Sequence, residues 1–241
     1  MAKLYAHRIH YLDPSGKFKE IDSRVVADRA GLKNAAGPAE VRFAPRADAA
    51  ELVKLSSGKH RISFSLPDAA ASAPVVDGST VTYPEVFPGV DLKYLVHPEG
   101  VKEVLVLKRP TETSAPFRFR MSPGALNPKT TSSGWIELAD ASGEVAFRIP
   151  PAQAWDSSAL TPQSSPLRPA TAKLVKSSEQ WFVDLAVDPG WLASAQYPVF
   201  VDPALLLAEG RGTIGTDGYI SDAAPSYSYC DDQCVPTTAL I

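Results

Sequence analysis

Proline is spread along this chain at a density that rules out long helices. The 241 residues include 22 prolines, about 9% against a usual content of about 5%. Proline lacks an N–H and clashes with the preceding helical turn, so each one interrupts a helix. Between the prolines lie short segments rich in Val, Ile, Phe, Tyr and Leu, often with apolar and polar residues alternating, which is typical of strands. We therefore predict an all-β protein of one or two antiparallel β-sandwiches, with long proline-rich loops and at most short helical turns.

Several turns are recognisable from their residues. Asp13-Pro14-Ser15-Gly16 separates residues 8–12 from 17–26, which predicts a hairpin. His97-Pro98-Glu99-Gly100 similarly joins residues 91–97 to 101–109. One helical turn is expected at residues 189–195, with Asp188 as its cap and Pro189 in first position. Further strands are expected over residues 40–43, 59–66, 79–83, 116–121, 134–138, 144–149, 170–176, 180–187 and 198–201, while residues 48–55 fit either a short helix or a strand.

The charge and hydropathy of the chain indicate whether it binds nucleic acid or crosses a membrane. Lys and Arg number 24 and Asp and Glu 27, a formal charge of −3, which supplies no net positive field for phosphates. We therefore expect no nucleic-acid partner. The longest apolar run, residues 204–208, is far shorter than the ~20 residues of a membrane-spanning helix, and no signal peptide is visible at the start of the chain.

Motifs of catalysis and cofactor binding are weak. Residues 210–215 satisfy G-x-G-x-x-G, but Gly218, Pro225 and a Ser/Tyr-rich stretch follow where a dinucleotide fold needs a helix. The histidines form no metal-binding spacing, and no nucleophile elbow or P-loop is present. We therefore expect no enzyme, no cofactor and no metal. A glycoside hydrolase with two facing carboxylates stays open as an alternative.

Two tryptophans and two cysteines are the candidate site residues. Trp135 and Trp155 could stack on pyranose rings, although tryptophans in strand-rich chains usually pack in the core. Cys230 and Cys234 could close a small disulfide loop in an oxidising compartment, bind a metal loosely, or stay free thiols.

A family resemblance rests on two long stretches. Residues 76–94 read VDGSTVTYPEVFPGVDLKY, and residues 98–108 read PEGVKEVLVLK. Together they resemble the N-terminal β region of large bacterial DNRLRE-domain and Rhs/YD-repeat proteins of the wall-associated-protein type. Shorter stretches that fit the same resemblance are residues 9–22, 147–156, 197–203 and 215–229. In the first stretch we expect the chain to cross from one sheet to the other after Pro84, with Asp91 bonded to loop amides.

The resemblance implies a domain division and a function. Residues 1–110 and 111–205 would be two sandwich halves, and residues 206–241 a linker and the start of a truncated DNRLRE-like module. The implied function is a non-catalytic scaffold or attachment domain of a large toxin-like protein, extracellular or on the bacterial surface. Its partners would be downstream domains of the same polypeptide and cell-wall glycan, with self-association through the C-terminal tail. Two alternatives are a glycan-binding module for cell-wall polysaccharide and a structural component of a phage-like injection particle.

Overall fold

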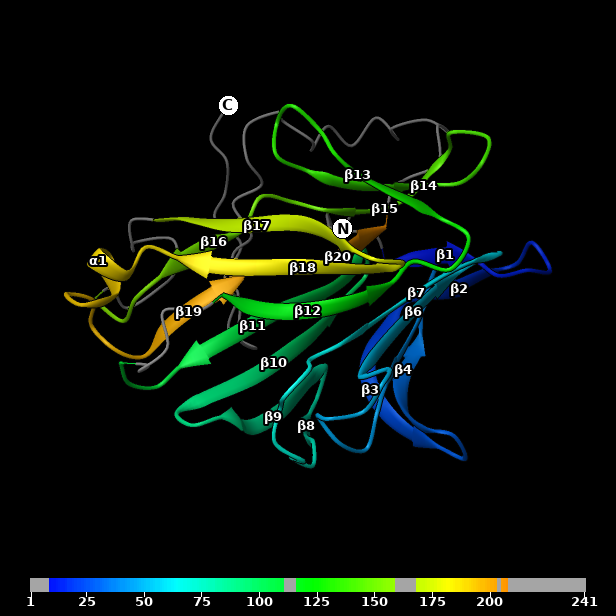
Figure 1. Cartoon of the computed structure of the whole chain (residues 1–241). Helices are drawn as coiled ribbons and strands as arrows, with labels where there is room; N and C mark the ends of the chain where they lie inside the picture. The colour runs from blue at the N-terminus through cyan, green and yellow to red at the C-terminus, as the bar shows by residue number, and fades with distance from the viewer. Residues whose placement is uncertain (1–8, 111–115, 159–167, 203–204, 208–241) are drawn as a thin grey trace, which may run out of the picture.

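The computed structural model describes residues 9–110, 116–158, 168–202 and 205–207. These residues form antiparallel strands and one helix of four residues, which confirms the predicted all-β sandwich. Two sheets face each other with the core between them, so that β18 lies above β10 in the view of Figure 1. A separate hairpin, β1 (His10–Leu12) and β2 (Phe18–Glu20), projects from one side.

Sheet I contains eight strands in the spatial order β3-β4-β5-β6-β7-β12-β18-β17. Their bounds are β3 Asp22–Asp28, β4 Gly31–Ala36, β5 Glu40–Phe43, β6 Val53–Ser57, β7 His60–Ser65, β12 Phe117–Ser122, β18 Gln180–Val187 and β17 Arg168–Ser177. Residues 48–55 thus contribute to strand β6 and not to a helix, because Val53 and Leu55 alternate into the core.

Sheet II begins with the antiparallel run β8-β9-β10-β11 and continues from β11 to two short strands, β19 and β20. Strand β19 also pairs with β16. Strand β20 pairs with β15, and the sheet continues through β14 to β13. The bounds are β8 Val75–Asp77, β9 Thr80–Phe87, β10 Val90–His97, β11 Gly100–Leu107, β19 Val199–Asp202, β20 Leu205–Leu207, β16 Gln153–Trp155, β15 Val145–Ile149, β14 Ile136–Ala139 and β13 Asn127–Thr130.

Strand β17 connects the two sheets. Its first residues, Arg168 and Pro169, pair with β16 of sheet II, whereas Ala170 to Ser177 pair with β18 of sheet I. The strands of both sheets therefore enclose one hydrophobic core, which includes Tyr83, Leu92 and Phe147 among its most buried side chains.

The stretch after Pro84 forms a hairpin within sheet II. Strands β9 and β10 pair directly, with a register shift between Val90 and Leu92, so the predicted crossing between sheets is wrong. The physical reason is that Gly89, with a positive φ of 78°, lets the chain reverse between Phe87 and Val90, while Glu85, with a φ of 51°, lies at the irregularity within β9. The predicted role of Asp91 is confirmed, because its carboxylate accepts a 2.8 Å bond from the Glu85 N–H.

Two further turn predictions are confirmed. Asp13 accepts hydrogen bonds from the Ser15 and Lys17 amides at 2.9 and 3.0 Å and so closes the β1–β2 turn. Helix α1 (Pro189–Leu192) begins after Asp188, whose carboxylate accepts a 2.9 Å bond from the Gly190 N–H.

The division into residues 1–110, 111–205 and 206–241 stays a prediction. Strand β12 lies between β7 and β18, so sheet I takes strands from both sides of residue 110. Most of the third region lies outside the described residues. Among the described residues, no helix is long and apolar enough to cross a membrane.

Candidate functional site

A surface with several basic side chains covers one end of sheet I. We define the basic face by the outward residues Arg61, Arg118, Arg120, Lys173, Phe182 and Asp184. They face outward because their neighbours along each strand, such as Phe119 on β12 and Val183 on β18, are buried in the core. The face thus follows from the alternation of apolar and polar residues on four adjacent strands, β7, β12, β18 and β17.

Strand pairing places these residues in two adjacent rows. In the first row Lys173 stands opposite Asp184, which stands opposite Arg118. In the second row Phe182 stands opposite Arg120. Because side chains two residues apart on one strand lie about 7 Å from each other and cross-strand neighbours about 5 Å, the five side chains form one continuous patch. Arg61 lies farther along β7, four residues before Ser65, which pairs with Arg120.

The carboxylate of Asp184 binds Arg118, whose guanidinium lies over the Phe182 ring. The Arg118 guanidinium donates to both Asp184 oxygens, at 2.7 and 2.6 Å. Its central carbon lies 5.2 Å from the centre of the Phe182 ring, a cation–π geometry. The carboxylate raises the pKa of Arg118, so this guanidinium is charged throughout the physiological range.

The remaining basic side chains of the face form no ion pair within the part of the chain that the structure describes. Arg61, Arg120 and Lys173 are exposed and form no ion pair with any residue that the structure describes. Farther along sheet I, Arg42 is in contrast paired with Asp28 and Glu40, and this pairing lowers the pKa of both carboxyl groups. Among the described strands of sheet I, the basic side chains without an ion pair therefore lie at the β7–β12–β18–β17 end, where they can attract phosphate groups.

A second group of titratable residues is buried in sheet II. Glu103 lies on the core side of β11, directly opposite Tyr94, and burial raises its pKa to about 8. On the other side of the same sheet, Lys102 and Asp202 form a 2.9 Å ion pair in which each side chain is 11% exposed. Burial raises the pKa of Asp202, while the Lys102 ammonium acts against that shift.

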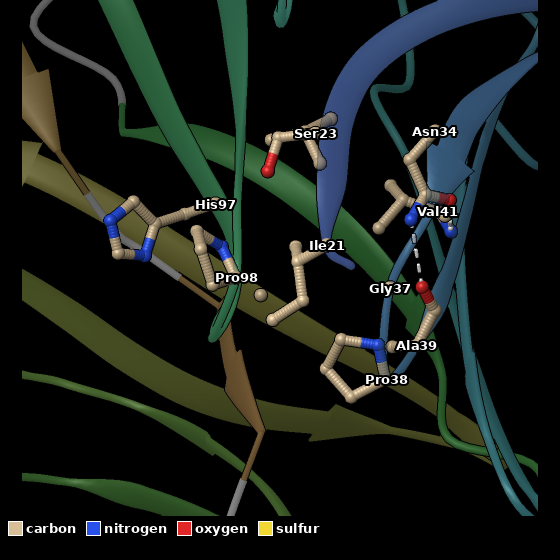
Figure 2. A pocket seen from close by; sticks show the side chains of 12 residues that line it. Ile21, Ser23, Asn34, Gly37, Pro38, Ala39, Val41, His97 and Pro98 are labelled. Atoms are coloured by element: carbon tan, nitrogen blue, oxygen red, sulfur yellow. Dashed lines mark hydrogen bonds between the residues drawn. The ribbon is translucent and has the colours of Figure 1, made fainter. Parts of the chain in front are cut away.

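Two small cavities among the described residues are too small to be ligand pockets, which usually measure about 300–1,000 Å³. One of about 30 Å³ is lined by Glu103, Tyr94 and apolar side chains. The other, of about 10 Å³, lies where His97 and Pro98 approach Asn34 (Figure 2). The Asn34 side chain is satisfied by Ala39 and Val41. Within the described residues, no three His, Cys, Asp or Glu side chains could hold a metal ion.

The predicted site residues lie apart from the basic face. Trp155 is buried at 6% exposure and stacks on Phe200, with ring centres 5.5 Å apart. Trp135 is half-buried beside β14, and its backbone N–H donates to the Thr131 hydroxyl at 3.1 Å. Cys230 and Cys234 lie outside the described residues. The glycan contact and the disulfide stay predictions. The signal that was missed is the outward row of arginines on β12, visible as Phe-Arg-Phe-Arg-Met at residues 117–121.

No family model and no solved structure matches the chain. Curated relatives do match. The tRNA nuclease WapA of Bacillus subtilis strain 168 is 28% identical over 178 residues, 72% of this chain. The tRNA(Glu)-specific nuclease WapA of Bacillus subtilis subsp. natto is 27% identical over 186 residues, 70% of this chain. The tRNA3(Ser)-specific nuclease WapA of Bacillus spizizenii is 28% identical over 178 residues, again 72% of this chain. The matched regions make up only 7–8% of the length of these relatives.

These relatives correct the family resemblance. Residues 76–94 and 98–108 were interpreted as a region that precedes a DNRLRE module in Rhs/YD-repeat proteins, and this interpretation is wrong. The relatives point to WapA-like nucleases instead. The physical reason is that these stretches form the hairpins β9–β10 and β10–β11. A turn motif that builds a fold does not identify the domains around it.

The expected functions are corrected as well. A non-catalytic scaffold or attachment domain, a glycan-binding module and a phage-like component all conflict with relatives that are named as nucleases. The prediction of no enzyme is corrected for the same reason, because the relatives are named as nucleases. It depended on motifs that are contiguous in sequence, whereas catalytic groups can come together from distant segments.

The exclusion of nucleic acid is also wrong, since the relatives are named for their action on tRNA. That exclusion used the charge of −3 for the whole chain. A net charge is a sum over all surfaces, and acidic residues elsewhere conceal a local positive patch such as the basic face.

Proposed function

We propose that this chain is part of a nuclease that cleaves tRNA, similar to the WapA proteins. The observation that carries this proposal is a similarity extending over 70–72% of the chain to three relatives that are all named as tRNA nucleases. Because the chain corresponds to only 7–8% of those relatives, the cleaving activity is proposed for the complete gene product.

The names of the relatives bear on what this region contributes. One relative is specific for tRNA(Glu) and another for tRNA3(Ser), yet their identities to this chain are 27% and 28%. Relatives that are named for different tRNAs therefore share this region. We propose that the region contributes a function common to all these nucleases, and that the selection of one tRNA depends on other parts of the protein.

We also propose that the complete protein acts outside the producing cell or at its surface, as predicted from the sequence. Fractionation of a culture into cytoplasm, wall and medium tests this location with an antibody against residues 9–110. Detection in the cytoplasm alone would contradict it.

The decisive test of the activity uses the complete gene product and the 241-residue chain side by side. Each is incubated with total bacterial tRNA, and the products are separated on a denaturing gel. We expect discrete tRNA fragments from the complete product. Intact tRNA in that reaction, under conditions in which a WapA nuclease cleaves, would reject the proposal. Cleavage by the 241-residue chain itself would place the active site within this region.

A further inference from the structure

We infer that the basic face of sheet I binds RNA, by holding the phosphate backbone with its basic side chains and stacking an unpaired base on Phe182. This inference rests on the proposed function, because that function supplies the class of partner. It goes further by assigning the contact to particular side chains.

The charge of the face matches a phosphate backbone. Arg61, Arg120 and Lys173 are exposed and have no carboxylate partner among the described residues, so binding a phosphate breaks no existing ion pair. Arg118 is half-exposed and keeps free donors beyond those that bind Asp184. Arginine also binds phosphate through two parallel N–H groups, a geometry that lysine lacks.

Phe182 adds a contact that a phosphate site alone does not need. Its ring lies on the outer face of sheet I, between Arg120 on β12 and Val175 on β17, while Trp181 and Val183 beside it pack against the core. Arg118 lies on this ring at 5.2 Å. An aromatic ring on the open face of a sheet, with arginines beside it, is the arrangement on which proteins stack unpaired RNA bases.

The same chemistry fits a function that is independent of the tRNA chosen. Contacts to phosphates fix position without reading sequence, and every base offers a face for stacking. The face therefore suits unpaired loops of any tRNA, in agreement with the presence of this region in relatives that are named for different tRNAs.

Binding is measured with the 241-residue chain by fluorescence anisotropy, using a labelled tRNA transcript, a single-stranded oligouridylate and an RNA duplex. We expect Arg120→Glu combined with Lys173→Glu to weaken tRNA binding at least about tenfold at low salt and to lower the salt dependence of the affinity by about one logarithmic unit per lost phosphate contact. Lys17→Glu combined with Arg29→Glu, the same two charge reversals at exposed positions of the β1–β2 hairpin and of the turn between β3 and β4, is the matched control and should leave the affinity within about twofold.

Stacking is tested by Phe182→Leu, which keeps an apolar side chain and removes the aromatic face. We expect at least about fivefold weaker binding of oligouridylate and little change for the duplex. An equal loss for both RNAs would overturn the stacking contact. Circular dichroism and thermal unfolding confirm that each variant is folded. If a charge reversal prevents folding, Arg120→Gln with Lys173→Gln replaces it, with a smaller expected loss.

Two outcomes overturn the inference: affinities unchanged by the substitutions on the basic face, or affinities weakened as much by Lys17→Glu with Arg29→Glu. The proposed function fails separately. If the complete gene product cleaves tRNA equally well with and without the substitutions at Arg120 and Lys173, the basic face is rejected and the nuclease stands. If no version cleaves tRNA, the nuclease is rejected whatever the binding result.

Discussion

Tyr94 and Glu103 stand directly opposite each other on β10 and β11, and both side chains are buried between the two sheets. The Tyr94 hydroxyl is close enough to act against the pKa shift of the carboxyl, yet it makes no well-aligned hydrogen bond with any described residue. Burial nevertheless dominates and raises the pKa of Glu103 to about 8. The core therefore contains a carboxyl group that is neutral at pH 7.

Glu103 makes the stability depend on pH. Its pKa is higher in the folded chain than the ordinary 4.5, so the folded state binds the proton more tightly. The free energy of unfolding then falls as the pH rises from about 4.5 to about 8 and levels off above that. Glu103→Gln removes this loss, and we expect the variant to be more stable than the natural chain by roughly 2–5 kcal/mol at pH 8.5. The difference should vanish near pH 4.5.

Urea unfolding at a series of pH values, followed by tryptophan fluorescence, measures this difference. Glu99→Gln, at an exposed position in the turn of the same hairpin, is the control and should show no such trend. A Glu103→Gln curve parallel to that of the natural chain would contradict a neutral buried carboxyl.

Trp155 and Trp135 should differ in their contribution to stability. Trp155 is 6% exposed, stacks on Phe200 and lies 5.4 Å from the Lys102 ammonium. Its replacement by Ala should lower the free energy of unfolding by about 3–5 kcal/mol. Trp135→Ala, at a half-buried position, should cost less than about 2 kcal/mol. Urea unfolding followed by circular dichroism compares the two, and equal losses would show that the Trp155 stack adds nothing.

Asn34 stabilises the turn between β4 and β5 from inside. Its side-chain amide donates to the Ala39 carbonyl at 2.9 Å, and its oxygen accepts from the Val41 N–H at 2.8 Å; Figure 2 shows this part of the chain. Asn34→Ala leaves both backbone groups without a partner in a buried site and should cost about 1–3 kcal/mol. Asn127→Ala, at an exposed position, is the control with little expected effect. Thermal unfolding provides the measurement, and indistinguishable midpoints would refute the argument.

Substitutions at Gly89 and Gly58 distinguish backbone strain from crowding of a new Cβ by a neighbouring side chain. Both have a positive φ, 78° and 54°, so an Ala at either position pays about 1 kcal/mol for its conformation. At Gly58 the new Cβ meets open space, whereas at Gly89 it would lie 2.7 Å from Arg109 Nε. We expect Gly89→Ala to be the more destabilising in urea unfolding, and Arg109→Ala in the same chain to remove the excess. An excess that persists without Arg109 would mean that another contact causes it.

Local patterns in the sequence were sufficient for much of the fold. The β10–β11 hairpin could be predicted because a Pro-Glu-Gly turn separates two alternating runs. Strand β4 was missed because Gly31–Ala36 contains Gly, Asn and two Ala and has little strand propensity of its own. It becomes a strand because β3 and β5 pair with it on both sides. Tertiary pairing of this kind leaves no local signal.

The candidate site was harder to predict than the fold. Arg118 and Arg120 are visible in the sequence as alternating residues of one strand, but Lys173 and Phe182 are more than fifty positions away and become their neighbours only through β17–β18 and β12–β18 pairing. A charge summed over the chain, −3, contains no information about which strands lie side by side. The order of strands within sheet I therefore had to be known before the face could be recognised.

The path of β17 has a mechanical consequence. Because one continuous strand pairs with β16 at its start and with β18 along the rest of its length, neither layer can separate from the other without breaking a ladder at one end of this strand. When force or denaturant opens one sheet, the backbone of β17 therefore disturbs the strand pairing of the other sheet as well. The amide protons of β16 and β18 should consequently exchange with solvent in the same opening event, as those of a single cooperative unit.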